Sequence, residues 1–214
     1  MIALPASPDS MEWKMKNNKR ILTIAAAFSA TALFATLAAV GADSPADAPL
    51  QRPADLRELV FLTSGYGMAY GPARRLAGTS PPFTNVYVTP ESYRSFARSG
   101  EWPEGTAFFL EIRQGRGQVS IDSHGQSQGD VLAIEAAVKD RKRNPLGGWA
   151  YFDFGPGGKA SSGKMLPTSE SCYSCHSRHG AVEWTFTQFY PEQFAVATAK
   201  GTVRKDYDPS VKVE

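Results

Sequence analysis

Cysteine is scarce in this sequence: among 214 residues there are two, Cys172 and Cys175. A disulfide between residues this close would close almost no loop and would stabilise the fold little. Beyond residue 42 the chain also lacks a surplus of either charge. Residues 1–42 hold four basic and two acidic residues, and the rest of the chain has equal numbers of each sign. No basic surface is therefore indicated, and neither nucleic acid nor an anionic membrane is an expected partner.

The first 42 residues have the organisation of a targeting segment. Four cations between Lys14 and Arg20 precede an apolar run at 21–40, and small residues follow at 40–42. We therefore predict a cleaved secretory signal peptide over residues 1–42 and a periplasmic mature protein that is not bound to the membrane. The alternative is a membrane anchor formed by residues 21–40, because a run of about twenty apolar residues is long enough to span a bilayer.

Three further regions are predicted beyond the signal peptide. Residues 43–56 are rich in proline, alanine and aspartate and are expected to form a disordered leader. Residues 57–191 are expected to fold into one domain, in which no internal repeat is present. Residues 192–214 are expected to form an irregular C-terminal tail.

The domain combines many short strands with few helical signals. Thr89-Pro90-Glu91 supplies an N-cap, a proline at the first helical position and an acid in the first turn, and Gly100 ends a helix predicted over 90–99. A glycine-rich loop over 155–163 leads to a second helix, capped by Thr168 or Ser169, that carries the cysteines. Strands are predicted at 58–64, 85–89, 106–113, 117–122, 131–140 and 147–155. These elements predict an α+β fold, predominantly antiparallel β-sheet with a few short helices.

The cysteines belong to the sequence Cys172-Tyr173-Ser174-Cys175-His176, which has the C-x-x-C-H pattern of c-type haem attachment. On a helix both thiols lie along one side, where each can form a thioether with a haem vinyl group, and His176 follows at a position suited to ligating the iron. Export agrees with this, because a covalent link retains haem outside the cytoplasm. We therefore expect one covalent haem c, held by Cys172, Cys175 and His176.

Other interpretations of the motif meet physical objections. A C-x-x-C redox pair usually lies near the start of a βαβ unit, whereas this motif lies late in a strand-rich chain. A zinc site made with His179 would crowd four ligands into eight residues, whereas zinc sites normally draw on two separated pairs. Haem attachment is therefore the preferred interpretation.

Methionine is lacking where an electron carrier would need it. No methionine follows His176, and only Met68 and Met165 remain after the signal peptide. Met165 is too close in sequence to the motif to reach the opposite haem face easily. His179 lies on the same side of the haem as His176, and His124 falls in a polar loop. By elimination the iron is expected to be five-coordinate or water-bound, which indicates binding or chemistry at iron rather than electron transfer alone.

The haem motif, followed by EWTFTQFYP at 183–191, resembles the cytochrome P-460 family, which includes the cytochromes c′-beta. The segments at 85–106 and 136–155 resemble that family in order and spacing, and the resemblance covers about residues 57–191. It implies a mainly antiparallel β fold, usually dimeric, with one c-type haem and an open distal site. P-460 members oxidise hydroxylamine and link a lysine to the haem. The c′-beta members lack this link and bind small gases, above all nitric oxide.

Lysine is absent where the resemblance implies it. The linking lysine belongs at the position of Leu110, yet residues 20–138 contain no lysine. An implied pocket arginine is replaced by Thr84. If Leu110 faces the haem, strand alternation places Phe108 and Ile112 on the same face, and the resulting apolar pocket suits a neutral diatomic ligand. Plain core packing is the alternative for Phe108 and Leu110.

The roles of several polar and aromatic residues each have two interpretations. Glu183 stands where the family usually has an acid, and it is either a proton acceptor or the cap of a turn. The basic run 139–143 is expected to be a solvated turn, with contact to haem propionates as the alternative. Trp149, Tyr151 and Phe152 are expected to pack in the core or at a dimer interface.

The sequence thus predicts an exported mono-haem c-type cytochrome with an open iron site that binds nitric oxide or a similar small gaseous or nitrogenous ligand. The first alternative is an enzyme that oxidises hydroxylamine or nitric oxide, and the second is a periplasmic electron carrier. A redox partner protein and a second copy of the chain, in a homodimer, are the expected protein partners.

Overall fold

The computed structural model describes residues 48–68 and 80–210, so the predicted signal peptide and the start of the predicted leader lie outside the described residues. Within the described residues, seven strands form one antiparallel sheet in the order β1-β7-β6-β5-β4-β3-β2. The strands are β1 (Leu50–Gln51), β2 (Val60–Tyr66), β3 (Phe83–Val88), β4 (Ala107–Gly117), β5 (Gln126–Lys139), β6 (Trp149–Pro156) and β7 (Ser162–Met165). The helices are α1 (Pro90–Ser99), α2 (Ser171–His179) and α3 (Pro191–Lys200), with 3-10 turns η1 (Leu56–Glu58) and η2 (Thr187–Phe189).

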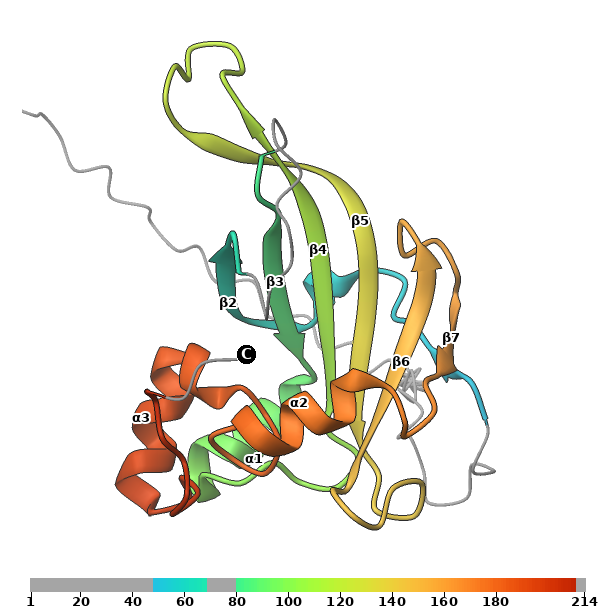
Figure 1. Ribbon diagram of the computed structural model, residues 1–214, viewed down its shortest axis with the longest axis vertical. Helices are drawn as coiled ribbons and strands as arrows, with labels where there is room; N and C mark the ends of the chain where they lie inside the picture. Colours follow the sequence, from blue (N-terminus) through green and yellow to red (C-terminus); the bar gives the residue numbers. More distant parts are fainter. Residues whose placement is uncertain (1–47, 69–79, 211–214) are drawn as a thin grey trace, which may run out of the picture. The chain divides into compact units, whose positions relative to one another are not determined.

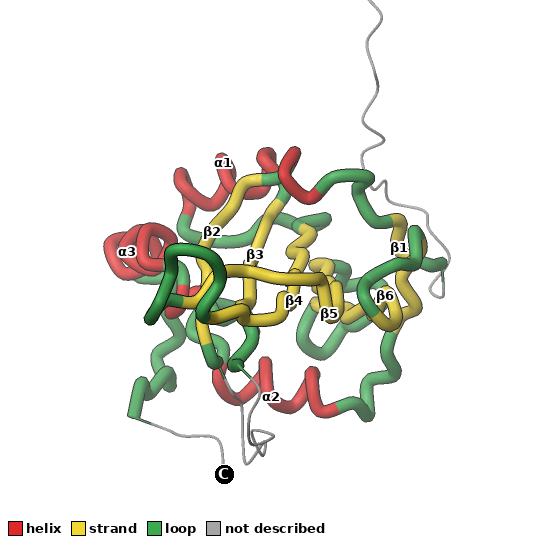
Figure 2. Tube along the Cα trace, turned by 90° about the horizontal axis from the view of Figure 1, so that it is seen from above, coloured by secondary structure: helices red, strands yellow, loops and turns green. Residues whose placement is uncertain are grey.

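Most of the sheet is a meander in which sequence neighbours pair. The exception is β1, which comes first in the chain and pairs with β7, the last strand. In Figure 1 the β4–β5 hairpin extends beyond the other strands, and the three helices lie toward the opposite end of the sheet. Figure 2 shows α2 running along one side of the row of strands.

Each face of the sheet has its own apolar core, because side chains alternate between the faces along every strand. One face, which we call the site face, carries Phe108 and Tyr151 and packs against residues of α1, α2 and α3. The opposite back face carries Phe109 and Phe152, which pack with Leu50 from β1. Removing both apolar faces from water is the main contribution to the stability of such a fold.

The predicted fold class is confirmed, and helix α1 has the predicted bounds. Its proline sits in the first turn, and Gly100 ends it in the left-handed region with φ 76°, donating its N–H to the Phe96 carbonyl. The strands predicted at 58–64, 85–89, 106–113, 131–140 and 147–155 correspond to β2, β3, β4, β5 and β6. Local capping signals and runs of β-branched or aromatic residues were therefore sufficient to predict these elements from the sequence.

The strand predicted at 117–122 is wrong. Beyond Gly117, which ends β4, these residues belong to the connection between β4 and β5, and Gln118 and Ser120 adopt positive φ angles of 57° and 59°. The strand that pairs with β4 is β5 itself. A second prediction missed β7, which begins within the expected glycine-rich loop and is only four residues long.

The predictions for both ends of the domain also need correction. Part of the expected disordered leader is β1, which adds Leu50 to the back-face core. Part of the expected irregular tail is α3, which has a proline in its first turn and ends at Gly201 with φ 70°. These are ordinary helix signals. None of the helices in the described part of the chain is long and apolar enough to span a membrane.

The two left-handed glycines that end α1 and α3 give a matched test of packing. A Cβ at residue 100 would lie 2.8 Å from Thr202 Oγ1 and 2.9 Å from Lys200 Cβ, whereas a Cβ at residue 201 would meet nothing within 4 Å. Both substitutions to alanine force a side chain into the left-handed region, which costs about 1–2 kcal/mol. Gly100→Ala should cost about 1–3 kcal/mol more through overpacking.

The measurement is the free energy of unfolding in urea, with Gly201→Ala as the control. The reason for a larger loss at residue 100 is that Thr202 cannot move away freely, since its hydroxyl donates a 2.7 Å hydrogen bond to the Gly100 carbonyl. Equal losses for the two variants would contradict the crowding around Gly100.

Candidate haem site

Helix α2 carries the predicted haem-attachment motif. Cys172, Cys175 and His176 all lie within this nine-residue helix, so the two thiols are about one turn apart on one side of it. The helix begins after Glu170 with no side-chain cap, which corrects the expectation that Thr168 or Ser169 caps it. Both thiols are free and half-buried. Burial raises the pKa of each thiol, and the negative charge of Glu135 adds to the effect at Cys172.

A cavity of about 510 Å³ separates α2 and the segment after it from the site face of the sheet. All three motif residues line it. So do all four of the residues that the sequence assigned to the distal pocket, Thr84 on β3 and Phe108, Leu110 and Ile112 on β4. Residues more than 60 positions apart in the chain therefore meet around one space. Their roles toward a bound group stay predictions.

His176 is held in a defined orientation. Its Nδ1 lies 2.8 Å from the carbonyl oxygen of Trp184. A carbonyl only accepts, so Nδ1 carries the proton and donates it, which leaves the lone pair of Nε2 available for a metal. The ring packs between Phe186 and Tyr151, with centroid distances of 4.2 and 4.7 Å. Burial lowers the pKa of His176 to about 4, so the imidazole is neutral at physiological pH, the form that ligates metals.

The turn that supplies the Trp184 carbonyl approaches the end of α2 closely. Gly180 follows the helix, and a Cβ there would lie 2.6 Å from the backbone carbon of Trp184 and 2.7 Å from the amide nitrogen of Thr185. Only glycine leaves room for this approach. The close backbone approach at Gly180 thus brings His176 together with its hydrogen-bond acceptor, Trp184, which lies eight residues further along the chain.

The residues around the cavity fit a haem group. The volume of the cavity lies within the range of cofactor and ligand pockets, and the cavity wall offers two thiols and a neutral imidazole. Two polar atoms of wall residues, Trp149 Nε1 and Tyr151 Oη, are buried without a hydrogen-bond partner in the described structure. Both atoms are fully buried behind the wall, so a group in the cavity would not contact them, and the fit to haem is given by the two thiols and the imidazole. In the part of the chain described, no three His, Cys, Asp or Glu side chains cluster around a single metal position.

A carboxylate and a thioether on the cavity wall were not predicted to lie there. Glu135 on β5 is opposite Leu110 in the sheet register and is the only carboxylate among the described wall residues. Desolvation, reinforced by the charge of Asp153 on β6, raises the pKa of Glu135. Met68, which follows β2, also lines the cavity. The alternation of Ala133, Glu135 and Ala137 along the strand could have predicted the position of Glu135. No local signal in the sequence marks Met68 as a cavity residue.

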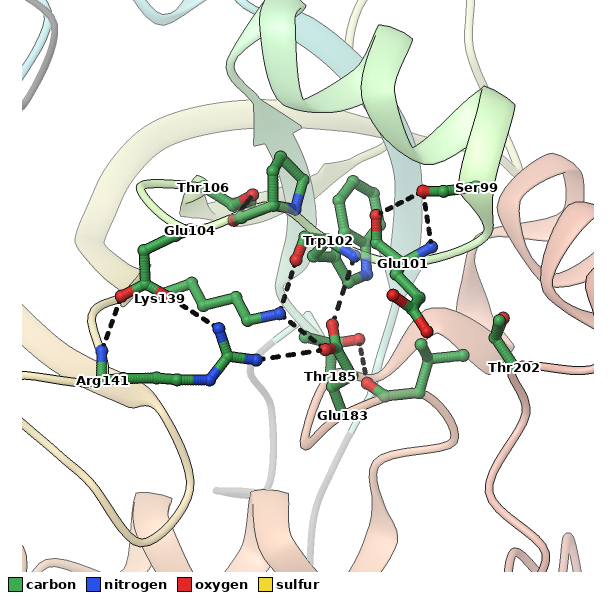
Figure 3. A network of polar contacts seen from close by, with 12 residues as sticks. Ser99, Glu101, Trp102, Glu104, Thr106, Lys139, Arg141, Glu183, Thr185 and Thr202 are labelled. Atoms are coloured by element: carbon green, nitrogen blue, oxygen red, sulfur yellow. Dashed lines mark hydrogen bonds and ion pairs between the residues drawn. The ribbon is translucent and has the colours of Figure 1, made fainter.

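Other candidate residues lie away from the described cavity wall. His124 is exposed in the β4–β5 connection, and His179 at the end of α2 does not line the cavity. Glu183 does not line it either. Its carboxylate accepts a 2.6 Å hydrogen bond from Lys139 Nζ and one of 3.2 Å from the Trp102 amide (Figure 3).

The expectation of a solvated basic turn at 139–143 is therefore wrong for its first residue. The Lys139 side chain is 4% exposed, because it reaches from the end of β5 into the interior and pairs with Glu183. Residues 44 positions apart form this pair, and neither periodicity nor composition indicates such a contact.

Comparisons with known proteins bear on the family to which the chain belongs. No curated protein matches the chain. The sequence profile described as Cytochrome P460 matches residues 64–187, more than half of the chain, from β2 to η2. This span includes all of the described cavity-wall residues except Thr63, Phe189 and Tyr190. The chain therefore belongs to the cytochrome P460 family.

Proposed function

We propose that this member of a haem-protein family is a periplasmic, mono-haem c-type cytochrome that binds nitric oxide or a similar small neutral ligand. The observation that carries the proposal is the composition of the cavity wall. The attachment motif and His176 form one side, and Phe108, Leu110 and Ile112 are on the strand across from it. A homodimer and a redox partner protein remain predictions.

The motif side of the cavity has what covalent attachment needs. Each thiol adds across one vinyl group, with its sulfur bonding to one carbon and its hydrogen to the other, so no oxidant is required. Raised thiol pKa values keep Cys172 and Cys175 in the protonated form at neutral pH. Nε2 of His176 is then the nitrogen free to ligate iron, which would supply the position where a small molecule binds.

The opposite wall favours an uncharged ligand. Apolar side chains at positions 108, 110 and 112 offer no hydrogen-bond donor, so they stabilise a charged molecule poorly. Leu110 stands where the resemblance to lysine-linked members implies a lysine, and described wall residues include none. The c′-beta type of activity is therefore better supported than oxidation of hydroxylamine.

One observation favours the enzyme as a second candidate. Oxidising hydroxylamine requires a group that removes protons, and Glu135 is a carboxylate on the cavity wall with a raised pKa. Another favours the electron carrier, because Met68 lies on the same wall and a thioether is a possible sixth iron ligand. Both residues permit direct tests.

Attachment is tested by single substitutions in α2. Protein produced with a haem-attachment system should carry one haem that survives acid-acetone extraction, and Cys172→Ser or Cys175→Ser should each retain at most one thioether. Ser174→Ala, on the same helix, should behave as wild type. Intact mass checks each expectation. A colourless, folded wild-type protein with a Cys172–Cys175 disulfide would refute the haem proposal.

The ferrous spectrum and turnover separate a gas-binding protein from an oxidase. We expect an ordinary c-type ferrous spectrum, ready binding of nitric oxide and little hydroxylamine oxidation with an artificial electron acceptor, because no lysine cross-link alters the macrocycle. A strongly red-shifted ferrous band with a lysine-containing haem peptide, or sustained turnover, would support the enzyme instead.

The Glu135 carboxylate distinguishes the same two functions by mutation. In a gas-binding protein, Glu135→Gln should change nitric oxide affinity little. In an oxidase it should lower turnover by about 100-fold or more, the usual contribution of a general base. The control is Asp153→Asn, which removes the neighbouring carboxylate opposite Glu135 in the sheet but outside the cavity wall.

The sixth position is tested at Met68. We expect a high-spin, five-coordinate ferrous spectrum that Met68→Leu leaves unchanged, since this nearly isosteric swap alters packing little. The matched control is Met165→Leu on β7, which is outside the cavity wall. A low-spin wild-type spectrum that becomes high-spin in Met68→Leu alone would instead identify an electron carrier.

A further inference from the structure

We propose that the buried Lys139–Glu183 ion pair is a positioning device for the haem ligand. It holds the turn Val182–Thr185 in the conformation in which the Trp184 carbonyl accepts the Nδ1 proton of His176. The pair would thereby set the orientation and basicity of the imidazole. The inference rests on the proposed ligation of haem iron by His176.

Lys139 is tied to its surroundings by strong contacts. Its Nζ donates to Glu183 Oε1 at 2.6 Å and to the Trp102 carbonyl at 2.5 Å. The backbone of Lys139 is also fixed, because its N–H donates to Thr106 and its carbonyl accepts from Gly105. The ammonium group is therefore an anchor at the end of β5, and Figure 3 shows its contacts with Glu183 and Trp102.

Glu183 uses both carboxylate oxygens to connect the turn to this anchor. Oε1 accepts from Lys139, and Oε2 accepts from the Trp102 amide at 3.2 Å. The indole of Trp102 donates in addition to Thr187 Oγ1 at 3.3 Å, just beyond the turn. One side chain thus joins the turn to both the end of β5 and the connection between α1 and β4.

The turn itself needs such support, because its backbone is locally unfavourable. Glu183 and Trp184 have positive φ angles of 48° and 69°, and the Thr185 N–H donates to the Val182 carbonyl at 2.8 Å. These are the features of a type I′ turn, which prefers glycine and asparagine at its two central positions. Two residues other than glycine or asparagine in the left-handed region raise the free energy of the turn. Tertiary contacts must offset this cost.

The conformation of the turn determines what His176 contacts. The carbonyl that accepts its proton belongs to Trp184, the second central residue. If the turn relaxed to negative φ angles, the peptide group after Trp184 would rotate and the hydrogen bond would be lost. Such outer hydrogen bonds fix the tautomer and ring orientation of a ligating histidine and raise its basicity. Glu183 therefore acts through Trp184, without touching the cavity.

Stability alone does not explain the pair well. A buried ion pair is often no more stabilising than apolar residues of similar volume, since both charges lose their hydration. Its geometry, however, joins a fixed strand end to the strained turn. The network continues outward to Arg141, which lies 3.9 Å from Glu183 and pairs with Glu104 at 2.8 Å. Glu104, the outer member of the network, is exposed and bonds to Arg141 rather than to the turn.

The test compares ion-pair variants of the haem-loaded protein. Lys139→Met removes the anchor but leaves Glu183 27% exposed and bound to the Trp102 amide, so no stranded buried charge results. Glu183→Gln is the milder variant, because its amide retains the size and part of the hydrogen bonding. Glu104→Gln is the matched control, since it breaks an ion pair in the same network away from the turn.

The readouts are the iron–histidine stretching frequency in the ferrous protein, by resonance Raman spectroscopy, and the reduction potential. In Lys139→Met we expect the frequency to fall and the potential to rise, because a less basic imidazole binds iron more weakly and stabilises ferric iron less. Glu183→Gln should shift both in the same direction by less, and Glu104→Gln should shift neither.

Frequencies and potentials equal to wild type in both Lys139→Met and Glu183→Gln, with haem attached and circular dichroism unchanged, would overturn the positioning role. If Lys139→Met fails to fold, the Glu183→Gln comparison decides alone. Failure of the proposed function gives a different result, because wild-type protein without covalent haem or without an iron–histidine band would show that His176 is not the ligand.

Discussion

The structure depends on the two-residue period of a single antiparallel sheet. Because successive side chains of β4 point to opposite faces, Phe109 belongs to the back-face core while Phe108, Leu110 and Ile112 reach the cavity. A slip of one residue in the β4 register would exchange these sets and eliminate the cavity wall. The same constraint places Glu135 beside Leu110, since these residues are register partners. The composition of the site is thus a consequence of strand pairing.

Helix α2 completes the site by closing over this surface. It has no side-chain cap, and its last turn is followed immediately by Gly180 and the strained turn. The helix is therefore fixed less by its own termini than by its packing, as where the ring of its Tyr173 meets that of Tyr151 on β6 at 4.8 Å. A cofactor joined to this helix would be fixed relative to the sheet by the same contacts.

The limits of sequence reasoning follow from the range of the interactions. Helix α1 was predictable because Pro90 and Gly100 specify its ends locally, and β4 and β6 were predictable because long apolar runs specify strands. The strands β1 and β7 were missed because two and four residues are too few to show a period. The sequence predicted that β5 is a strand. It did not predict that Ala137 and Glu135 on this strand line the cavity. The partnership of Lys139 with Glu183 depends on the finished fold and leaves no local pattern.

The topology of the sheet also has a consequence for the order of folding. From β2 to β7 every strand pairs with its neighbour in the chain, so each pairing closes a short loop at a small cost in entropy. The pairing of Leu50 in β1 with Gly163 in β7 joins residues more than a hundred positions apart and must wait until the meander has reached β7. Of the described strands, the first to be synthesised is therefore the last that can join the sheet. β1 therefore stays unpaired until β7 has paired with β6, so a change that prevents the β6–β7 pairing also removes the partner of β1.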